Sequence, residues 1–425
     1  MARTALTLRS HQRKVVEHLG RNRGVIALHS TGTGKTITAV ASARALIARK
    51  TVTRAIALVN KSIIAQFWAE IRAVSPALER RFDVMTPHRF ATVVDGLDLR
   101  GCMLIVDEAH HFTNAGGAHT RAILEASRAC SRVLLLSATI FRNDVYDVAP
   151  MLAMVTGADT VPPRAMFVKG GEVDRRSIKS MLKGWISVHL IDKNKRKSYP
   201  TLVEHDVRVR ATAATIAEIV DRPRGPFMVR ERMFGLGACP TPMELSNEEL
   251  VGCCEKCAWT LKRVRTWIRK REKCVLYAPM LETGVRLLAN MLVNEKVDHR
   301  LIDGATPAAE RAEYATAFNS YPDRGGVPVL VISPAGAESM DLKGVRHVVM
   351  MAPSWTHAFE SQIVGRAQRY RSHAHLPANQ RTVDVWKLCL TAPRTATADV
   401  IMSDFVNRKR ADANERYAIA KAASI

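Results

Sequence analysis

The fold of this chain is decided by the stretch Gly24-Val25-Ile26-Ala27-Leu28-His29-Ser30-Thr31-Gly32-Thr33-Gly34-Lys35-Thr36. The apolar run at residues 25–28 predicts a buried strand, and the apolar spacing of residues 37–47 predicts a helix after the loop. Glycines in the loop let backbone N–H groups approach phosphate oxygens, and the helix N-terminus directs its partial positive charge at the same anion. The stretch therefore predicts a phosphate-binding strand, loop and helix, which is typical of an α/β fold.

The motif also gives each polar residue a chemical task. The lysine would reach the β- and γ-phosphates of ATP, and the hydroxyl that follows it would bind Mg²⁺. His29 stands where the usual G-x-x-x-x-G-K-[ST] pattern has its first glycine, so the match is partial. A glycine- and threonine-rich turn without a ligand is the alternative that this motif alone leaves open. The residues expected to hold ATP and Mg²⁺ are Gly32, Thr33, Gly34, Lys35 and Thr36.

A second apolar run, at residues 102–106, ends in the acidic residues Asp107 and Glu108. Ligands of parallel sheets collect at the carboxyl ends of strands, so we expect Asp107 to hold Mg²⁺ together with Thr36. Glu108 is then placed to orient or deprotonate the attacking water. Acids at a strand end can also lie in a solvated loop, but the phosphate-binding loop upstream favours the catalytic interpretation.

Two further motifs complete the pattern: Ser137-Ala138-Thr139 after the apolar run at residues 133–136, and Gln362-Ile363-Val364-Gly365-Arg366-Ala367-Gln368-Arg369. With these motifs and Asp107-Glu108-Ala109-His110 in this order, the chain resembles the superfamily 2 helicases and translocases from about Leu8 to about Leu390. The resemblance implies two tandem RecA-like lobes, each a mostly parallel sheet with helices on both faces, that clamp one ATP between them. Within that superfamily it favours DNA translocases and the transcription-associated ATPases of large DNA viruses.

The resemblance extends to single residues of the second lobe. Arg366 and Arg369 match the arginines that this family directs toward the γ-phosphate, and a planar guanidinium suits the charge of a phosphoryl transition state. Gln362 would help to seat the same interface. The alternative is a basic, solvent-facing helix that contains Gly365.

Residues 331–342 resemble the family's segment that contacts nucleic acid and ribose. This likeness makes Asp341 a candidate for binding the nucleotide and Ser333 a candidate for binding nucleic acid. Ser339 stands where many relatives have glycine, and a backbone position with positive φ would strain a serine.

Upstream of the phosphate loop, residues 8–12 resemble the family's adenine-reading segment, in which Gln12 would pair with the base. An amphipathic helix beginning there is compatible with that role. The resemblance also implies that His110, Ser137 and Thr139 relay the state of the nucleotide to the nucleic acid. The two hydroxyl groups could equally cap helices.

The composition predicts a polyanionic partner. The chain has 425 residues, with 63 Lys and Arg against 40 Asp and Glu, so its formal net charge is +23. Nucleic acid is the simplest such partner, and the resemblance favours DNA over RNA, with transcription or replication proteins as further expected partners. Small, polar or basic residues near strand ends would grip the phosphate backbone, although ordinary loop polarity explains each of them nearly as well. These candidates are Lys61, Thr86, Thr306 and Ser333.

The chain has no apolar N-terminal signal and no run near the roughly 18 apolar residues of a membrane span, so we expect a soluble intracellular protein without a membrane partner. Its 8 cysteines are too sparse for a disulfide framework. Cys239, Cys253, Cys254 and Cys257 leave a zinc site open. A second C-x-x-C pair is missing, however, and residues 254–271 have helical spacing, which disfavours zinc.

The expected domains are residues 1–165 as the first lobe, residues 166–200 as a linker or crossing segment, and residues 201–425 as the second lobe, with a less ordered insert at about 222–250. Apolar runs that alternate with helical stretches predict the strands of both sheets. They are residues 25–28, 55–59, 82–85, 103–106 and 133–136 in the first lobe, and 274–278, 300–302, 329–332, 345–351 and 383–390 in the second, with a further strand at 204–210.

The predicted function is hydrolysis of Mg-ATP coupled to closure of the two lobes and movement on DNA. Two alternatives stay open from the sequence. One is an ATP-gated nucleic-acid-binding subunit of a transcription complex with incidental hydrolysis. The other is an RNA-remodelling helicase, which keeps the chemistry and changes the polymer.

Overall fold

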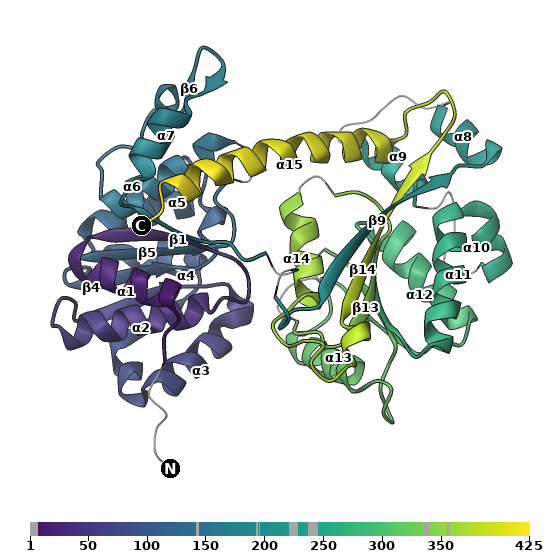
Figure 1. The fold of residues 1–425 in the computed structure, drawn as a ribbon, viewed down its shortest axis with the longest axis horizontal. Coiled ribbons are helices and arrows are strands. Elements are labelled where there is room, and N and C mark those ends of the chain that lie inside the picture. Colours follow the sequence, from purple (N-terminus) through teal and green to yellow (C-terminus); the bar gives the residue numbers. More distant parts are fainter. Residues whose placement is uncertain are drawn as a thin grey trace. The chain divides into compact units, whose positions relative to one another are not determined.

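The computed structural model describes residues 7–141, 144–192, 194, 196–220, 228–236, 245–334, 340–354 and 357–425. The chain forms two compact units, coloured along the sequence in Figure 1. Unit 1 comprises Met1–Ile191 and Ala411–Ile425, and unit 2 comprises Asp192–Arg410. Each unit is built around a six-stranded sheet with helices on both faces, which confirms the predicted α/β fold with two RecA-like lobes.

The six strands of the unit 1 sheet run parallel, in the order β3-β2-β4-β5-β1-β8. These strands are β1 (Gly24–His29), β2 (Arg54–Leu58), β3 (Phe82–Met85), β4 (Cys102–Val106), β5 (Arg132–Ser137) and β8 (Ile186–His189). The α-helices are α1 (Ser10–Arg21), α2 (Lys35–Ala48), α3 (Ile64–Val74), α4 (Pro87–Val93), α5 (Ala118–Ala129), α6 (Ala149–Thr156) and α7 (Arg175–Leu182). Between α6 and α7, the short strands β6 (Val168–Lys169) and β7 (Glu172–Val173) pair antiparallel.

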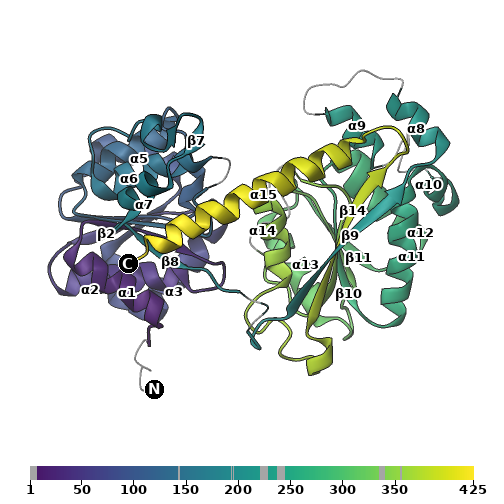
Figure 2. The same cartoon turned by 45° about the horizontal axis from the view of Figure 1, so that its top comes forward.

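Helices bury both faces of this sheet, which explains why its central strands are nearly continuous apolar runs. On one face α1, α2 and α3 contribute Val15, Val40 and Phe67 to the core. On the other face α5 and α6 contribute Ile123 and Leu152, and Figure 2 shows these two helices and α7 across the sheet from α1, α2 and α3. Because the strands are parallel, their carboxyl ends meet at one edge, where loops can gather ligand-binding residues.

Unit 2 has a second parallel sheet, in the order β11-β12-β10-β13-β14-β9. Its strands are β9 (Thr201–Arg210), β10 (Lys273–Tyr277), β11 (His299–Ile302), β12 (Val329–Ile332), β13 (Val345–Met350) and β14 (Thr382–Thr391). Its α-helices are α8 (Ala213–Val220), α9 (Val229–Phe234), α10 (Asn247–Cys253), α11 (Glu255–Arg269), α12 (Leu287–Asn294), α13 (Ala308–Ser320) and α14 (His357–Ala367). The long helix α15 (Ala398–Ala422) begins in unit 2, and its last residues belong to unit 1.

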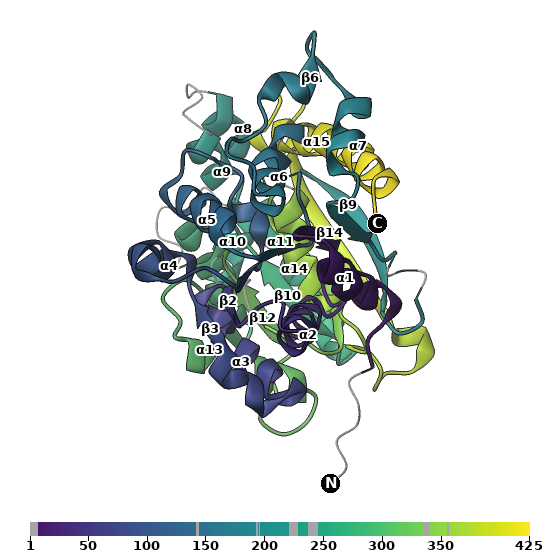
Figure 3. The ribbon, with the colours of Figure 1, turned by 90° about the vertical axis from the view of Figure 1, so that its left-hand side faces the viewer.

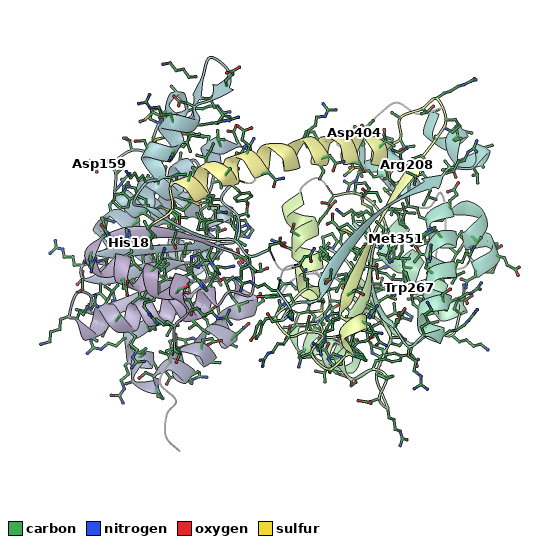
Figure 4. All side chains as sticks on the ribbon, viewed as in Figure 1. His18, Asp159, Arg208, Trp267, Met351 and Asp404 are labelled. Carbon is green, nitrogen blue, oxygen red and sulfur yellow. The ribbon has the colours of Figure 1, made fainter. Side chains whose placement is uncertain are left out.

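The helices of unit 2 also cover both faces of their sheet, as Figure 1 shows. Helices α11 and α12 pack Leu261 and Leu288 into one core, while α13 and α14 pack Phe318 and Ile363 into the other. Trp267 of α11, labelled in Figure 4, stacks on the ring of His347 with a centroid separation of 4.0 Å. The described residues include no helix that is both long and apolar enough to span a membrane.

The structure divides the chain differently from the predicted boundaries. The segment at 166–200, expected as a linker, contains α7 and β8, and β8 pairs with β1 as the sixth strand of the unit 1 sheet. The second lobe, expected to reach residue 425, ends at Arg410, because the last turns of α15 bury Ile419 and Ala420 in the core of unit 1. Within the expected insert at 222–250, α9 and the start of α10 are helical, and residues 222–227 and 237–244 lie outside the described residues.

Candidate nucleotide-binding site

The predicted phosphate loop joins the end of β1 to the start of α2. Gly32 and Gly34 have φ angles of 78° and 84°, in the left-handed region that favours glycine. A Cβ atom added to Gly34 would also lie 2.5 Å from Nε2 of Gln12. The backbone conformation therefore favours glycine at residue 34, and a side chain there would also displace the amide group of Gln12.

Side chains from α1 hold the carbonyl groups of this loop. Nε2 of Gln12 donates hydrogen bonds to the carbonyl oxygens of Thr33 and Gly34 at 3.2 and 3.3 Å, and Nε2 of His11 lies 3.1 Å from the same oxygen of Thr33. Figure 3 shows α1 beside α2. No side chain caps the N-terminus of α2, so its first amide N–H groups are available to an anion. This arrangement of tied carbonyls and open amides fits the polyphosphate of a nucleotide.

The end of β8 supports the loop from the other side. The backbone N–H of Ser30 donates to the carbonyl oxygen of His189 at 3.0 Å, and the N–H of Ile191 donates to Oγ of Ser30 at 3.0 Å. The ring of His189 stacks on that of His11 with centroids 3.7 Å apart. Sequence reasoning missed these contacts because it placed residues 166–200 in a linker. The alternation of Ile186, Ser187, Val188 and His189 is the one sequence signal that could have indicated this strand.

His29 explains why the loop departs from the usual glycine pattern. Its side chain is fully buried, and its Nε2 lies 3.2 Å from Oγ of Ser187 on β8. Burial, with smaller contributions from His11, His189 and Lys35, lowers the pKa of His29 to about 3, so the ring is neutral at physiological pH. The histidine therefore packs against the neighbouring strand and does not need to contact the phosphate.

The two acidic residues follow β4 at the same edge of the sheet. The N–H of Asp107 donates to the carbonyl oxygen of Leu58 at 2.9 Å, which extends the ladder between β4 and β2. Burial and the neighbouring charge of Glu108 raise the pKa of Asp107. Glu108 has a φ angle of 48°, an uncommon conformation for a residue with a side chain, which indicates local strain.

The carboxylate of Glu108 lies within hydrogen-bonding distance of His110. Oε2 of Glu108 is 3.2 Å from Nδ1 of His110. Burial alone would raise the pKa of Glu108, but the hydrogen bond from His110 and the charge of Lys35 together lower it well below its usual range. Glu108 is therefore ionised at neutral pH and can accept a proton.

The three candidate relay residues form one hydrogen-bonded group. Nδ1 of His110 is 3.1 Å from Oγ of Ser137. That hydroxyl donates its proton to the carbonyl oxygen of Thr139 and accepts the N–H of Thr139 at 3.1 Å. Because a hydroxyl has one proton to give, Nδ1 of His110 must be the donor toward both Ser137 and Glu108. The structure thus brings His110, Ser137 and Thr139 together beside Glu108.

Two candidate nucleic-acid contacts also follow strands of unit 1. Lys61 is exposed just after β2. Thr86 follows β3, and its hydroxyl caps α4 by accepting the N–H of Arg89 at 3.2 Å. Both residues lie at the carboxyl edge of the sheet, which they share with the phosphate loop and Asp107. A contact with nucleic acid stays a prediction for both, and for Thr86 it must coexist with the capping role.

In unit 2 the structure pairs two predicted residues that are distant in sequence. Gln362 and Arg366 lie on α14, and Arg369 follows that helix. Nη1 of Arg369 is 3.3 Å from Oδ1 of Asp341. This ion pair joins the arginine motif to the end of the segment at residues 331–342. Residues 335–339 of that segment, including Ser339, lie outside the described residues.

The other two candidate contacts of unit 2 are engaged within their own loops. The hydroxyl of Thr306 donates to Oδ1 of Asp303 at 3.0 Å and accepts the N–H of Asp303 at 3.0 Å. Ser333 is buried, and its N–H donates to the carbonyl oxygen of Ile302 at 3.0 Å. These contacts fix the loops after β11 and β12 and leave the nucleic-acid role of both residues a prediction.

Cys254 of unit 2 has a local structural role. Sγ of Cys254 caps α11 by accepting the N–H of Cys257 at 3.3 Å, and it donates to the carbonyl oxygen of Leu236 at 2.6 Å. Within the described ranges, no cluster of three or more His, Cys, Asp or Glu side chains could hold a metal ion. Cys239 and the side chain of Cys253 lie outside those ranges, so the zinc hypothesis gains no support here.

A cavity of about 420 Å³ lies elsewhere in unit 2, among β9, β14 and the first turns of α15. Arg208 and Asp404, both labelled in Figure 4, are among its lining residues. None of the predicted nucleotide-binding residues lines this cavity. The candidate site is therefore defined by the motif residues at the edge of the unit 1 sheet, and the cavity is separate from them.

Two parallel α/β sheets, a glycine-rich loop at the N-terminus of a helix, and an acidic pair after β4 at the same sheet edge define a P-loop nucleoside triphosphatase with tandem RecA-like lobes. Two family profiles match the chain. The profile of the helicase conserved C-terminal domain matches residues 256–371, and that of the type III restriction enzyme res subunit matches residues 5–81.

Related proteins occur in large DNA viruses. A protein of Acanthamoeba polyphaga mimivirus, provisionally named ATP-dependent RNA helicase L538, is 28% identical over 436 residues, which cover 95% of this chain and 94% of that protein. The termination factor NPH-I homolog of African swine fever virus is 21% identical over 490 residues, covering 85% and 68%. The SWI2/SNF2 ATPase core of Sulfolobus solfataricus, solved with double-stranded DNA, aligns over 98% and 97% with 14% identity and a TM-score of 0.44. The motifs and sequence matches support a superfamily 2 helicase related to viral transcription ATPases.

Proposed function

We propose that this superfamily 2 helicase couples hydrolysis of Mg-ATP to movement along DNA. The observation that supports the proposal most directly is the hydrogen-bonded group at one sheet edge, in which Glu108 contacts His110 and His110 contacts Ser137. It lies on the same unit as a loop whose amides are open to phosphate. A base and an anion site that share one edge have the composition that phosphoryl transfer to water requires.

Each residue of the loop has a role in holding the substrate. Lys35 and the N-terminus of α2 bind the β- and γ-phosphates, and Gln12, which already contacts the loop, binds adenine. Thr36 and Asp107 hold Mg²⁺, because a hydroxyl and a carboxylate are oxygen ligands of the kind that this ion prefers. When bound, the ion neutralises charge on the phosphate oxygens.

Glu108 acts as the general base. The oxygen of a water molecule attacks the γ-phosphorus, the bond from that phosphorus to the bridging oxygen of ADP breaks, and Glu108 takes the proton of the water. The products are ADP and inorganic phosphate. His110 holds the carboxylate in position through its Nδ1–H, while Arg366 and Arg369 stabilise the transition-state charge when the lobes close on ATP, with Gln362 and Asp341 at the same interface.

The polymer is gripped through its backbone. The net charge of +23 supports salt-sensitive phosphate contacts, and Lys61, Thr86, Thr306 and Ser333 are the proposed contact residues. The African swine fever virus relative carries the name of a termination factor, which supports transcription proteins as partners. RNA remodelling is the second candidate function, and the name of the mimivirus relative favours it.

The test compares steady-state ATPase rates without polymer and with single-stranded DNA, duplex DNA or RNA. We expect DNA to stimulate turnover, and we expect Glu108→Gln to lower kcat by about 10²- to 10⁴-fold with ATP still bound. Glu125→Gln on the exposed surface of α5 is the matched control and should behave as wild type. Stimulation by RNA alone would favour an RNA-remodelling helicase. An ATPase rate that no polymer changes would favour an ATP-gated subunit. Full activity of Glu108→Gln would contradict the assignment of Glu108 as the general base.

A further inference from the structure

The last turns of α15 bring a tyrosine to the hydrogen-bonded group beside the catalytic base. The hydroxyl of Tyr417 donates to Oγ1 of Thr139 at 2.6 Å. The ring of Tyr417 packs edge-on against Phe141 with a centroid separation of 6.0 Å. Burial raises the pKa of Tyr417, so its hydroxyl keeps its proton and acts as the donor.

This end of α15 is held firmly against unit 1. Oγ of Ser424 accepts the N–H of Val188 at 2.8 Å, and the N–H of Ile425 donates to the carbonyl oxygen of Ile186 at 2.9 Å, so the chain lines the outer edge of β8. Figure 3 shows this end of α15 beside α7, where Glu415 pairs with Arg175 at 2.7 Å. The phenol of Tyr417 is therefore presented to Thr139 from a fixed support.

A continuous series of contacts leads from this phenol to the base. Thr139 receives Tyr417 on its side chain, while its backbone N–H and carbonyl both engage Oγ of Ser137. Ser137 contacts His110, which in turn contacts Glu108. Each link is a directional hydrogen bond between buried or half-buried groups, and such a network transmits the loss of one member to the next.

We propose that Tyr417 is a positioning residue for ATP hydrolysis, which fixes the turn at Ser137 and Thr139 and thereby the orientation of His110 and Glu108. The inference rests on the proposed role of Glu108 as the base. It gives α15 a direct influence on the chemical step, although this helix lies about 300 residues after the acidic motif. Nucleotide binding should be untouched, because the hydrogen bond and the ring contact of Tyr417 involve Thr139 and Phe141, which lie outside the phosphate loop.

The test removes the hydroxyl and keeps the ring. Tyr417→Phe should lower kcat about three- to tenfold, the range expected for loss of one buried hydrogen bond, with KM for ATP and ATP affinity unchanged. The amide of Thr139 should also exchange its hydrogen faster in the nucleotide-free protein. Tyr146→Phe is the matched control, because Tyr146 packs edge-on against Phe167 in the same unit at 5.4 Å.

Thr139→Val removes the other partner of the same bond. If Tyr417 acts through Thr139, Tyr417→Phe should change kcat little further in a Thr139→Val background. The inference is overturned if Tyr417→Phe matches Tyr146→Phe in kcat and in amide exchange, if the two losses multiply in the double variant, or if KM rises while kcat is unchanged. Failure of the proposed function has a different signature, since Glu108→Gln would then keep its turnover.

Discussion

Asp399→Asn removes the countercharge of a lysine that has no access to solvent. Lys256 of α11 is 0% exposed and Asp399, in the first turn of α15, is 2% exposed, and the two side chains form an ion pair. Oδ2 of Asp399 also accepts the N–H of Leu390 at 2.7 Å. The pair therefore fixes the start of α15 to the sheet and to α11 within unit 2.

The expected loss follows from what each substitution leaves behind. Asparagine keeps an oxygen that can accept the N–H of Leu390, so the interaction that Asp399→Asn removes is the charge that balances Lys256. Stranding one member of a buried pair costs about 3–5 kcal/mol of unfolding free energy, and Lys256→Met should cost a similar amount by stranding the carboxylate. The double variant buries no charge, so we expect it to recover to within about 2 kcal/mol of wild type.

The assay is urea titration followed by hydrogen exchange and mass spectrometry, which reports unit 1 and unit 2 separately. Only peptides of unit 2 should lose protection at lower urea. Glu282→Gln is the control, because its pair with Arg286 is exposed and should contribute less than about 1 kcal/mol. The reasoning fails if Asp399→Asn costs no more than this control, or if the double variant loses as much as the two single variants together.

Three further predictions concern single positions. Gly34→Ala should weaken binding of a fluorescent ATP analogue, because φ is 84° and the added Cβ would lie 2.5 Å from Nε2 of Gln12 and displace it from the loop carbonyls. Gly170→Ala, where φ is 61° and nothing lies within 4 Å, should cost about 1 kcal/mol of stability and leave that binding intact. Burial lowers the pKa of Lys273 to about 8, so the unfolded chain binds more protons than the folded chain between pH 8 and about 10.4. In urea titrations, the unfolding free energy of unit 2 should therefore rise with pH over that window, and Lys273→Met should remove this rise. Cys254→Ala should destabilise unit 2 by about 1 kcal/mol through loss of the α11 cap, Cys254→Ser should retain most of that stability, and equal melting temperatures for the two variants would contradict the capping role.

The central strands could be predicted from sequence because their physics is local. The expected strands at residues 25–28, 82–85, 103–106 and 133–136 agree with β1, β3, β4 and β5 to within one residue at each end. Helices bury both faces of the central strands β1, β4 and β5, so each contains an uninterrupted apolar run, whereas the edge strand β3 carries Asp83. The motif residues then follow at the carboxyl ends, which is why the loop at Gly32 and the acids after β4 were found together.

The contacts around these motifs depend on neighbours that are distant in sequence. Nothing near His29 shows that its side chain meets Ser187 on β8, 158 positions away. Likewise, the pairing of Arg369 with Asp341 follows from the placement of two loops, while the motif alone suggests contact with a phosphate. The residue types were enough to predict the chemistry of the site. The contact partner of each side chain became known only from the folded structure.

The elements that sequence analysis left out of unit 1 are linked by contacts that the end of α15 makes. Strand β8, helix α7 and the end of α15 have no long apolar run, and the end of α15 contacts both of the others. Val188 of β8 donates to Ser424, and Arg175 of α7 pairs with Glu415. The entropy cost of closing a chain loop grows only slowly with loop length. These contacts can therefore offset the cost of bringing residue 417 back to residue 139. The alternation at residues 186–189 indicates a strand, but no local pattern shows that it pairs with β1 on one side and contacts Ser424 on the other. The contact of Tyr417 with Thr139 likewise requires the end of α15 to pack on unit 1, and it is suited to adjusting the base without altering the loop that binds the nucleotide.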